Sequence, residues 1–305
     1  MELEYLETQI RLPKIIVVYA GPTELVDPEM SPTNPTYEQA NNLKYHLNTA
    51  YFLKHGVQCK TQDTLIVLTN ATISLYQSQI QEMDNECNKK YNHRVLVTTR
   101  EPYCYDLEAV RVAVMDQIVN IRDYDYFLYI NCGVSGPAKE MANLPWTNLF
   151  LNKLKGRVKM TGLSHNCFYP HIQSMMFALD REGLQIVLQG GAIFKCTQRW
   201  PKFNEMEEHS SKSLIIFEYE IKMSELILSA GYAIEPYLRS QVLVKENVSH
   251  CIGNDTWIGE ELRELYDGRI PFLNETVFFK STRYLSPELA QEIGYNITID
   301  HNWGI

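Results

Sequence analysis

The sequence of 305 residues has no long hydrophobic run. A helix that spans a bilayer needs about 20 consecutive, mostly apolar residues, and no segment of this chain approaches that length. The N-terminal stretch MELEYLETQIRLPK is charged and lacks the apolar centre of a signal peptide. We therefore expect a protein without a transmembrane segment, in the cytoplasm.

Positive charge is also scarce. The 28 lysines and arginines are outnumbered by 37 aspartates and glutamates, which gives a formal net charge of -9 at pH 7. A general DNA or RNA binder needs a basic surface that displaces the counterions of the phosphates. The charge balance argues against a nucleic-acid partner but leaves room for a local basic pocket that holds a diphosphate.

The cysteines form no CxxC pair. There are seven of them, scattered at positions 59, 87, 104, 132, 167, 196 and 251. This odd number and wide spacing predict reduced thiols in the cytoplasm rather than a disulfide framework or a zinc site. Asn-x-Ser/Thr sequons begin at Asn70, Asn247, Asn254, Asn274 and Asn296. Without a secretion signal, we interpret them as chance occurrences.

Apolar strands alternate with amphipathic helices over the first 200 residues. The predicted strands are 14–19, 65–68, 95–98, 126–130 and 158–163, and the predicted helices are 38–54, 73–86, 106–120 and, further on, 214–230 with Gly231 as its C-terminal stop. This alternation predicts an α/β fold with a mostly parallel sheet flanked by helices. At 45% hydrophobic residues, the chain can bury one large core.

In such a sheet, ligands bind outside the carboxyl ends of the strands. That rule selects the loops 20–23, 69–71, 99–106 and 131–137. The first of them, Ala20-Gly21-Pro22-Thr23, lacks the GxGxxG fingerprint of a dinucleotide site. A Rossmann oxidoreductase or methyltransferase is therefore a weak alternative.

The loop 100–106 carries an arginine and an aspartate. The planar fork of Arg100 can pair with a phosphate or a carboxylate. Asp106 can accept hydrogen bonds from a ribose or sugar hydroxyl, or it can cap the helix that follows it, and the two roles are compatible.

The loop 131–137 combines glycines with polar residues. Gly133 and Gly136 flank Ser135, which lets backbone N–H groups approach an anion closely, and Asn131 offers both a donor and an acceptor. The same composition is also typical of an ordinary turn.

Five segments resemble, in the same order, the motifs of a group of GT-A glycosyltransferases. They are VLVTTREPYCYDLEAVRVAV (Arg-x-Asn-x-Gly-Tyr/Phe-Asp), YFLYINCGVSGP (Asn-x-Ser-x-Arg-Gly-Pro), HNCFYPHIQSMMFALDREGL, YEIKMSELILSAGYAIEPYL and IPFLNETVFFKSTR. Such proteins occur in algae, plants and bacteria, and the capsid-glycan enzymes of large algal viruses (chloroviruses) are the most similar. If the chain is viral, its expected compartment is the host cytoplasm.

The resemblance implies a Rossmann-like GT-A fold over residues 12–285. Its nucleotide-sugar-binding half is 12–140, its acceptor and catalytic half is 141–285, and 286–305 is a tail. A C-terminal extension is expected to close the donor site. The implied activity is a hexosyl or pentosyl transfer from a nucleoside diphosphate sugar, with UDP favoured, to a hydroxyl of a glycan or glycoprotein acceptor. The alternative is a nucleotide-sugar-binding or carbohydrate-binding protein without turnover.

The resemblance also suggests which residues bind the donor. Arg100 and Asp106 hold the nucleotide sugar, the 20–23 loop surrounds the nucleoside, and Lys280 with Arg283 faces the diphosphate or forms an ordinary exposed basic pair. The full set is Ala20, Gly21, Pro22, Thr23, Arg100, Asp106, Asn131, Cys132, Gly133, Ser135, Lys280 and Arg283.

This sequence departs from the family pattern at several positions. Pro102, Cys104 and Ser135 stand where the motifs have asparagine, glycine and arginine. The Asp-x-Asp that holds a metal in many GT-A enzymes is replaced by Asn131-Cys132-Gly133. The Asp123-Tyr124-Asp125 sequence precedes its strand and so belongs to the wrong end of the sheet. Dependence on Mn²⁺ or Mg²⁺ is thus left open, with Asn131 as a candidate weak oxygen ligand.

An inverting transfer needs a base that deprotonates the acceptor hydroxyl. Glu220 is the first candidate, because it shares a helix face with Ser224 and partial burial raises a carboxyl pKa. Asp180 is the second candidate, with an ion pair to Arg181 as its alternative role, and Glu218 is a weaker third. His165 and His171 are expected near the acceptor. Trp146, Trp200 and Trp257 can stack on sugars or belong to the core.

Overall fold

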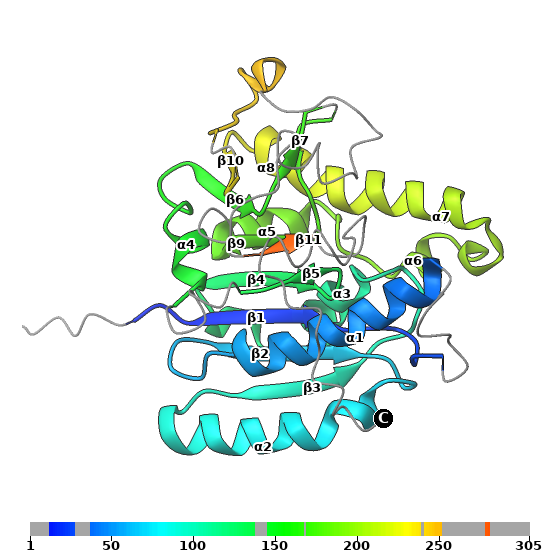
Figure 1. Ribbon diagram of the computed structural model, residues 1–305. Helices are drawn as coiled ribbons and strands as arrows, with labels where there is room; N and C mark the ends of the chain where they lie inside the picture. Colours follow the sequence, from blue (N-terminus) through cyan, green and yellow to red (C-terminus); the bar gives the residue numbers. More distant parts are fainter. Residues whose placement is uncertain are drawn as a thin grey trace, which may run out of the picture.

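The computed structural model describes residues 12–27, 37–137, 145–167, 169–238, 241–251 and 278–280. Its centre is a seven-stranded sheet of order β10-β6-β9-β4-β1-β2-β3 (Figure 1). The strands are β1 (Ile15–Ala20), β2 (Asp63–Leu68), β3 (Val95–Thr99), β4 (Tyr126–Asn131), β6 (Val158–Gly162), β9 (Met176–Asp180) and β10 (Ala233–Pro236). β9 is antiparallel to its neighbours β4 and β6, and the other pairings are parallel. The predicted α/β fold is confirmed.

Helices cover both faces of the sheet. Ile16 and Val18 of β1 belong to a core that includes residues of α3 (Glu108–Met115), α5 (Arg181–Gln189) and α8 (Lys222–Ser229). Val17 and Tyr19 face the other side, towards α1 (Tyr37–His55), α2 (Ile73–Tyr91) and α4 (Thr147–Leu151). A strand that is covered on both faces is apolar throughout its length, which explains the continuous run IIVVYA.

The five predicted strands all form, within two residues of the predicted bounds. The strands β9 and β10 were not predicted. An apolar stretch of four or five residues can be either a strand or a piece of buried helix. The remaining short elements are η1 (Ile121–Asp123), β5 (Val134–Ser135), β7 (His165–Asn166), β8 (His171–Ile172), α6 (Cys196–Arg199), η3 (Phe203–Glu205), η5 (Val248–His250) and β11 (Phe279–Lys280).

Two predicted helices differ in detail. The helix expected over 106–120 occupies only Glu108–Met115, and Gln117 has the positive φ of 56° that ends helical geometry. The helix expected over 214–230 forms as α7 (Glu208–Ile215), a π-helical turn η4 (Ile216–Ile221) and α8. Gly231 follows with a φ of 84°, as predicted for a residue that stops a helix.

Six of the seven cysteines are paired. The disulfides are Cys59–Cys87, Cys104–Cys196 and Cys167–Cys251, with Cα–Cα distances of 4.9, 5.6 and 5.6 Å, within the usual range for this bond. Cys132 is free and buried. The prediction of reduced thiols is wrong, because the fold brings together cysteines that lie 28 to 92 residues apart. The cysteine pattern thus no longer supports a cytoplasmic location.

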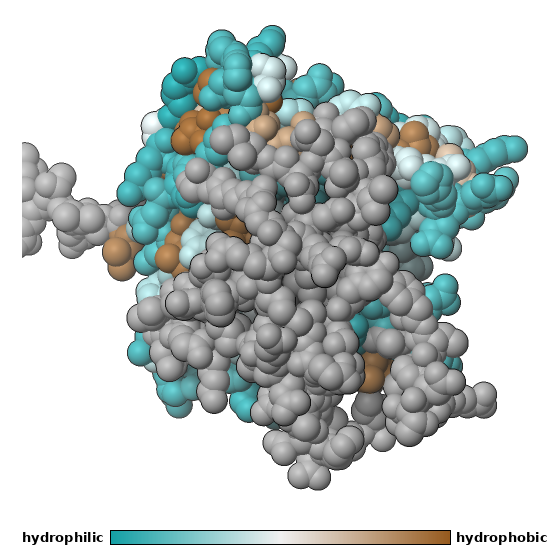
Figure 2. Space-filling view, turned by 45° about the horizontal axis from the view of Figure 1, so that its top comes forward, coloured by the Kyte–Doolittle hydropathy of each residue, from teal (hydrophilic) through white to brown (hydrophobic). Residues whose placement is uncertain are grey.

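The described surface on the face shown in Figure 2 is mostly hydrophilic. The exposed large apolar side chains include Leu12 at 79% and Leu25 at 51% exposure. Within the described residues, none of the helices combines the length and the hydrophobicity that a membrane span requires.

Trp146 belongs to the core rather than to a sugar-stacking surface. Its side chain is fully buried, contacts Phe278 edge to face with ring centroids 4.9 Å apart, and donates from Nε1 to the carbonyl of Gly56 at 2.9 Å. Trp200 is partly buried and packs against Phe194 and Phe203.

We expect Trp146→Ala to lower the free energy of unfolding by about 3–5 kcal/mol, because it leaves a large cavity and removes the indole hydrogen bond to the Gly56 carbonyl. Urea titration of the variant measures this loss. Trp200→Ala is the matched comparison and should cost less, because the Trp200 ring is already partly exposed. Equal stability of Trp146→Ala and the unsubstituted chain would contradict the core assignment.

Candidate functional site

The carboxyl ends of four parallel strands meet at one edge of the sheet, in the order β4-β1-β2-β3. Backbone hydrogen bonds continue past the strand ends and join the loops. The N–H of Cys132 donates to Ala20 at 2.8 Å, that of Gly21 to Val67 at 2.9 Å and that of Arg100 to Leu68 at 2.7 Å. The loops selected from the sequence are therefore neighbours in space.

Arg100 is a buried cation that is held by carbonyl groups. It is 5% exposed, and its Nη1 donates to the carbonyl of Tyr105 at 2.9 Å, while Nη2 donates to that of Gly21 at 3.4 Å. Its Nε has no hydrogen-bond partner, and no carboxylate in the described parts of the chain lies within ion-pair distance. Burial raises the pKa of the Glu108 carboxyl, and the charge of Arg100 acts to lower it. The Nε–H of Arg100 remains an unused donor within the described residues.

Asp106 faces β4 instead of capping a helix. Its Oδ2 accepts hydrogen bonds from the Tyr129 hydroxyl at 3.0 Å and from the Asn131 side-chain amide. Leu107 occupies the cap position of α3, and no side chain bonds the first helical amides. The capping role considered above is therefore not observed. Both bonds use Oδ2, and Oδ1 has no hydrogen bond within the described residues.

Charges from the 100–106 loop act on β4. Burial is the main cause that raises the pKa of the Tyr129 phenol well above its ordinary value, and the negative charge of Asp106 adds to it. The positive charge of Arg100 acts in the opposite direction on the same group. Arg100, Asp106 and the end of β4 thus form one electrostatic unit.

The side chain of Asn131 is occupied on both sides. Its amide nitrogen donates to Asp106, and its Oδ1 accepts from the N–H of Gly133 at 3.0 Å. Next to it, burial raises the pKa of the Cys132 thiol to about 12. Cys132 is consequently a neutral thiol, unsuited to be a nucleophile or a thiolate ligand.

The 20–23 loop is fixed by two threonines of the neighbouring loop. Thr72 Oγ1 donates to the carbonyl of Pro22 at 2.9 Å, and Thr69 Oγ1 donates to that of Thr23 at 2.7 Å. A Cβ on Gly21 would come within 2.4 Å of a Leu68 methyl group. Only glycine fits this position without displacing that side chain.

The C-terminal segment returns to the same edge. β11 pairs antiparallel with β5, so that Phe279 lies opposite Ser135 and Lys280 opposite Val134. Ser135 is 1% exposed, and Gly133 is buried as well. The backbone of Lys280 thus lies beside the 131–137 loop, whereas Arg283 and Trp257 lie outside the described residues.

Glu220 also lies at this edge. Its carboxylate accepts hydrogen bonds from His171 Nε2 at 3.2 Å, from Ser174 N at 3.1 Å and from Ser174 Oγ at 2.8 Å. The carbonyl of the next residue, Met175, accepts from the N–H of Asn131 at 3.1 Å. The Glu220 network therefore adjoins the end of β4.

Glu220 and Ser224 share a helix face, as predicted. The hydroxyl of Ser224 accepts from the N–H of Ile172 at 3.0 Å, in the same segment that Glu220 binds. The expected direction of the Glu220 pKa is wrong, however. Burial raises the pKa, but the hydrogen bond and charge of His171 and the two donors of Ser174 outweigh it and bring it below its ordinary value.

Asp180 lies at the opposite edge of the sheet. β9 is antiparallel, so that Asp180 is opposite Tyr126, the first residue of β4. Its carboxylate caps α5 by accepting from Gly183 N at 2.8 Å and pairs with Lys159 at 2.8 Å. The reversed direction of β9 is the reason that Asp180 does not join the candidate site, and we do not carry it forward as a base.

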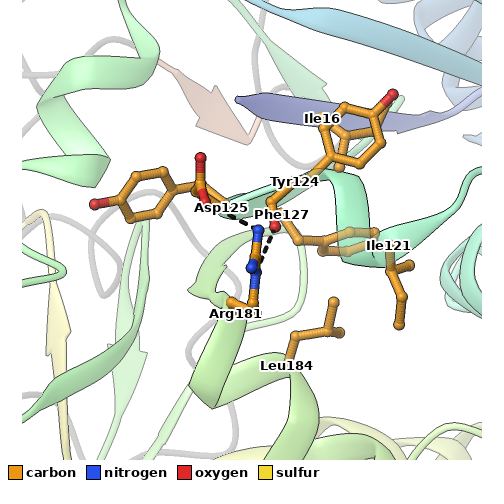
Figure 3. A pocket seen from close by; sticks show the side chains of 8 residues that line it. Ile16, Ile121, Tyr124, Asp125, Phe127, Arg181 and Leu184 are labelled. Atoms are coloured by element: carbon orange, nitrogen blue, oxygen red, sulfur yellow. Dashed lines mark hydrogen bonds and ion pairs between the residues drawn. The ribbon is translucent and has the colours of Figure 1, made fainter. Parts of the chain in front are cut away.

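Asp123-Tyr124-Asp125 lies at that same amino edge, as predicted. Figure 3 shows Asp125 and the Tyr124 carbonyl bound by Arg181, at 3.0 Å each, in a small pocket. The lining residues are Ile16, Ile121, Tyr124, Asp125, Tyr126, Phe127, Arg181 and Leu184. Glu218 forms a surface pair with Arg199 at 2.7 Å.

One group of potential metal ligands is present in the described ranges: His165, Cys167 and Cys251, whose ligand atoms lie within 4.8 Å of one another. The two cysteines are bonded to each other, so we assign no metal there. At the candidate site, Asp106 Oδ1 is a carboxylate oxygen without a hydrogen bond in the described ranges, and Asn131 Oδ1 accepts one from Gly133 N.

Sequence reasoning did not find Tyr129 and Ser174 as site residues. Tyr129 belongs to the apolar run YFLYI, where nothing marks its hydroxyl as a partner of Asp106. Ser174 lies 46 residues from Glu220 in the chain, and only the direction of β9 brings the two together.

No family model and no curated protein sequence matches this chain. The solved structures that resemble it do so at low identity, and three of them serve as examples. The mannosyltransferase PcManGT from Pyrobaculum calidifontis, in complex with GDP-Man and Mn²⁺, has 10% identity and a TM-score of 0.40, and the match covers 74% of this chain and 55% of that chain. A protein assigned as a glucose-1-phosphate thymidylyltransferase from Bacillus anthracis, in complex with sucrose, has 12% identity, a TM-score of 0.37 and coverages of 79% and 98%.

The third structure is a glycosyltransferase involved in glycosylation of the major capsid of PBCV-1. It has 13% identity and a TM-score of 0.31, and the match covers 51% of this chain and 73% of that one. This chain spans about half the length of the mannosyltransferase. Similarities at this distance do not identify a reaction.

The lowered pKa of Glu220 predicts a pH-dependent stability. The folded pKa lies below the unfolded value of 4.5, so the ionised carboxylate stabilises the fold above that value, and its contribution is lost as the pH falls through the folded pKa. Glu220→Gln should cost about 2 kcal/mol at pH 7, and this difference should shrink towards pH 3.

Urea unfolding at pH 7, 5, 4 and 3 measures this difference. Glu218→Gln is the matched control, because Glu218 lies two residues away on the surface, and its effect should be small at every pH. A Glu220→Gln difference that stays constant from pH 7 to pH 3 would contradict the lowered pKa.

Proposed function

We propose that this chain is a GT-A glycosyltransferase that moves a sugar from a nucleoside diphosphate sugar, with UDP as the favoured nucleotide, to a hydroxyl of a glycan or glycoprotein. The observation that carries the proposal is the presence of a buried Arg100, held by backbone carbonyls, and of Asp106, bound to the end of β4, in one loop at the carboxyl edge of a parallel sheet. In open α/β sheets, this edge is the usual place for a nucleotide.

Each residue of the loop has a task in donor binding. The charge of Arg100 and its Nε stabilise the diphosphate, on which negative charge develops as the sugar leaves. Asp106 Oδ1 accepts a hydrogen bond from a ribose or sugar hydroxyl. The loop of Ala20, Gly21, Pro22 and Thr23 surrounds the nucleoside.

The 131–137 loop and the C-terminal segment complete the donor half. In this proposal the 131–137 loop borders the diphosphate, and the pairing of β11 with β5 supports a C-terminal segment that closes the site. Lys280 and Arg283 supply further positive charge in this proposal. The chain forms one domain over 12–285, with a donor half at 12–140 and an acceptor half at 141–285.

A divalent cation fits this site. Mg²⁺ and Mn²⁺ are commonly bound through one or two carboxylates together with substrate phosphates, and Asp106 supplies one carboxylate with a hydrogen-bond-free oxygen. Asp106 and Asn131 would hold the ion, which when bound neutralises charge on the diphosphate. The other groups that contact the donor in this proposal are side chains and backbone groups of the chain.

Glu220 is the proposed base of an inverting transfer. It is ionised at neutral pH and lies at the same edge as Asn131, unlike Asp180. Its lowered pKa makes it a weaker base than burial alone predicts, so proton transfer from the acceptor hydroxyl would run late in the transition state. The Ser174 hydroxyl donates to Glu220 Oε2, which is the kind of contact that the acceptor hydroxyl makes in this proposal.

A thermal-shift titration tests donor binding. UDP with Mn²⁺ should raise the melting temperature, since a ligand at a hundred times its Kd stabilises the native state by about 2.7 kcal/mol. Arg100→Ala and Asp106→Ala should abolish the shift, while Glu218→Gln should leave it unchanged. The absence of a shift with UDP, GDP or another nucleoside diphosphate at several millimolar would contradict the proposal.

Turnover separates the enzyme from the alternative, a binding protein without activity. We expect slow hydrolysis of a radiolabelled UDP-sugar in the absence of an acceptor, measured as free sugar released. Glu220→Gln should bind the nucleotide with unchanged affinity and lose acceptor-dependent transfer at least tenfold. Full nucleotide binding with no release from any nucleotide sugar would favour the binding protein.

A further inference from the structure

The 100–106 loop contains two consecutive left-handed residues. Cys104 has a φ of 64° and Tyr105 a φ of 56°. This conformation costs roughly 1–2 kcal/mol for a residue with a Cβ and is adopted freely only by glycine. Such a turn persists only where the surrounding structure holds it in place.

Both left-handed residues are anchored in the second half of the chain. Cys104 is 2% exposed and forms a disulfide with Cys196, the buried first residue of α6, 92 residues later. Tyr105 Oη lies 3.0 Å from Ser211 Oγ and 3.2 Å from the carbonyl of Glu208, both on α7. The covalent bond is the stronger of these two anchors.

The left-handed turn at residues 104 and 105 positions the charged residues of the site. The carbonyl of Tyr105 accepts from Arg100 Nη1 at 2.9 Å. Asp106 follows directly and reaches Tyr129 and Asn131 from there. A change at residues 104 and 105 would therefore remove a partner of Arg100 and reorient Asp106.

We propose that the Cys104–Cys196 disulfide is a positioning cross-link, which holds the left-handed turn so that Arg100 and Asp106 can bind the nucleotide. Nucleotide affinity consequently depends on oxidation of this pair. Formation of the bond from two thiols transfers two electrons and two protons to a thiol–disulfide oxidant such as oxidised glutathione. The effect on affinity rests on the proposed nucleotide site, whereas the cross-link and its effect on the loop do not.

The chain offers a matched control. The Cys59–Cys87 disulfide joins the turn after α1 to the last part of α2, with a Cα–Cα distance of 4.9 Å. Cys59 precedes β2, so this bond lies towards the amino edge of the sheet, away from the candidate site. Its removal also deletes a cross-link but leaves the 100–106 loop intact.

The first measurement counts thiols by mass spectrometry after alkylation under denaturing conditions. Without reduction, we expect one alkylated cysteine, the free Cys132, and after reduction all seven cysteines of the chain. Alkylation of Cys104 and Cys196 without reduction would overturn the proposal.

The second measurement compares Cys104→Ser/Cys196→Ser with Cys59→Ser/Cys87→Ser. Both variants should melt at a lower temperature, because a cross-link restrains the unfolded chain. Only the first should raise the Kd for UDP, by at least tenfold, while the second stays within twofold of the unsubstituted chain. Equal affinities in all three proteins would overturn the positioning role.

Rescue by glycine tests the turn itself. Glycine adopts a positive φ without strain, so Cys104→Gly/Cys196→Ser should bind UDP more tightly than Cys104→Ser/Cys196→Ser, although both lack the bond. No recovery would refute the claim that the bond acts through the conformation of the turn.

Hydrogen exchange of the amides at 101–106 gives a readout that needs no nucleotide. Exchange should accelerate in Cys104→Ser/Cys196→Ser and not in the control variant. If UDP fails to bind the oxidised, unsubstituted chain, the proposed function is wrong, and this exchange difference still decides whether the cross-link positions the loop. Unchanged exchange would refute the cross-link's role.

Discussion

The hydrogen bonds that Asp106 accepts from β4 depend on how the chain crosses the sheet. β3 and β4 are consecutive strands in the chain, yet β1 and β2 lie between them in the sheet. The connection that leaves β3 must therefore pass over the carboxyl ends of β2 and β1 before α3 begins. This path lays Arg100 against the carbonyl of Gly21 and brings Asp106 to Tyr129 and Asn131.

The sequence predicts this edge because alternating strands and helices imply parallel pairing, and parallel pairing places the strand ends together. Arg100, Asp106 and Asn131 could thus be selected before any coordinates were known. The direction of β9 could not be predicted, since an apolar stretch such as MMFAL fits a parallel or an antiparallel strand. Asp180 was consequently expected at the wrong edge, and the Ser174–Glu220 contact was missed. Helical spacing did predict the shared face of Glu220 and Ser224, but not the partners that lower the pKa of Glu220.

Cysteine spacing fails as a predictor here for a similar reason. Pairing depends on which loops the fold brings together, and the separations of 28, 84 and 92 residues follow no motif. The odd total reflects the buried Cys132, which the fold keeps away from the other six. A positive φ at a cysteine, as at Cys104, indicates a disulfide more clearly than spacing does, because a strained residue has to be held in place by its surroundings. That sign is visible only in the backbone angles.

The balance of charges at the carboxyl edge of the sheet links the two halves of the chain. Arg100 and Asp106 carry opposite charges at this edge, so the diphosphate of the proposed function would need further cations. Asn131-Cys132-Gly133 stands where the motifs that the sequence resembles have an aspartate pair, so this chain carries less negative charge there. The segment that returns along β5, with the backbone of Lys280 opposite Val134, enters at the place where additional positive charge would act on the same phosphates. Under the proposed function, a basic C-terminal segment and a bound metal are therefore two ways to meet one electrostatic requirement.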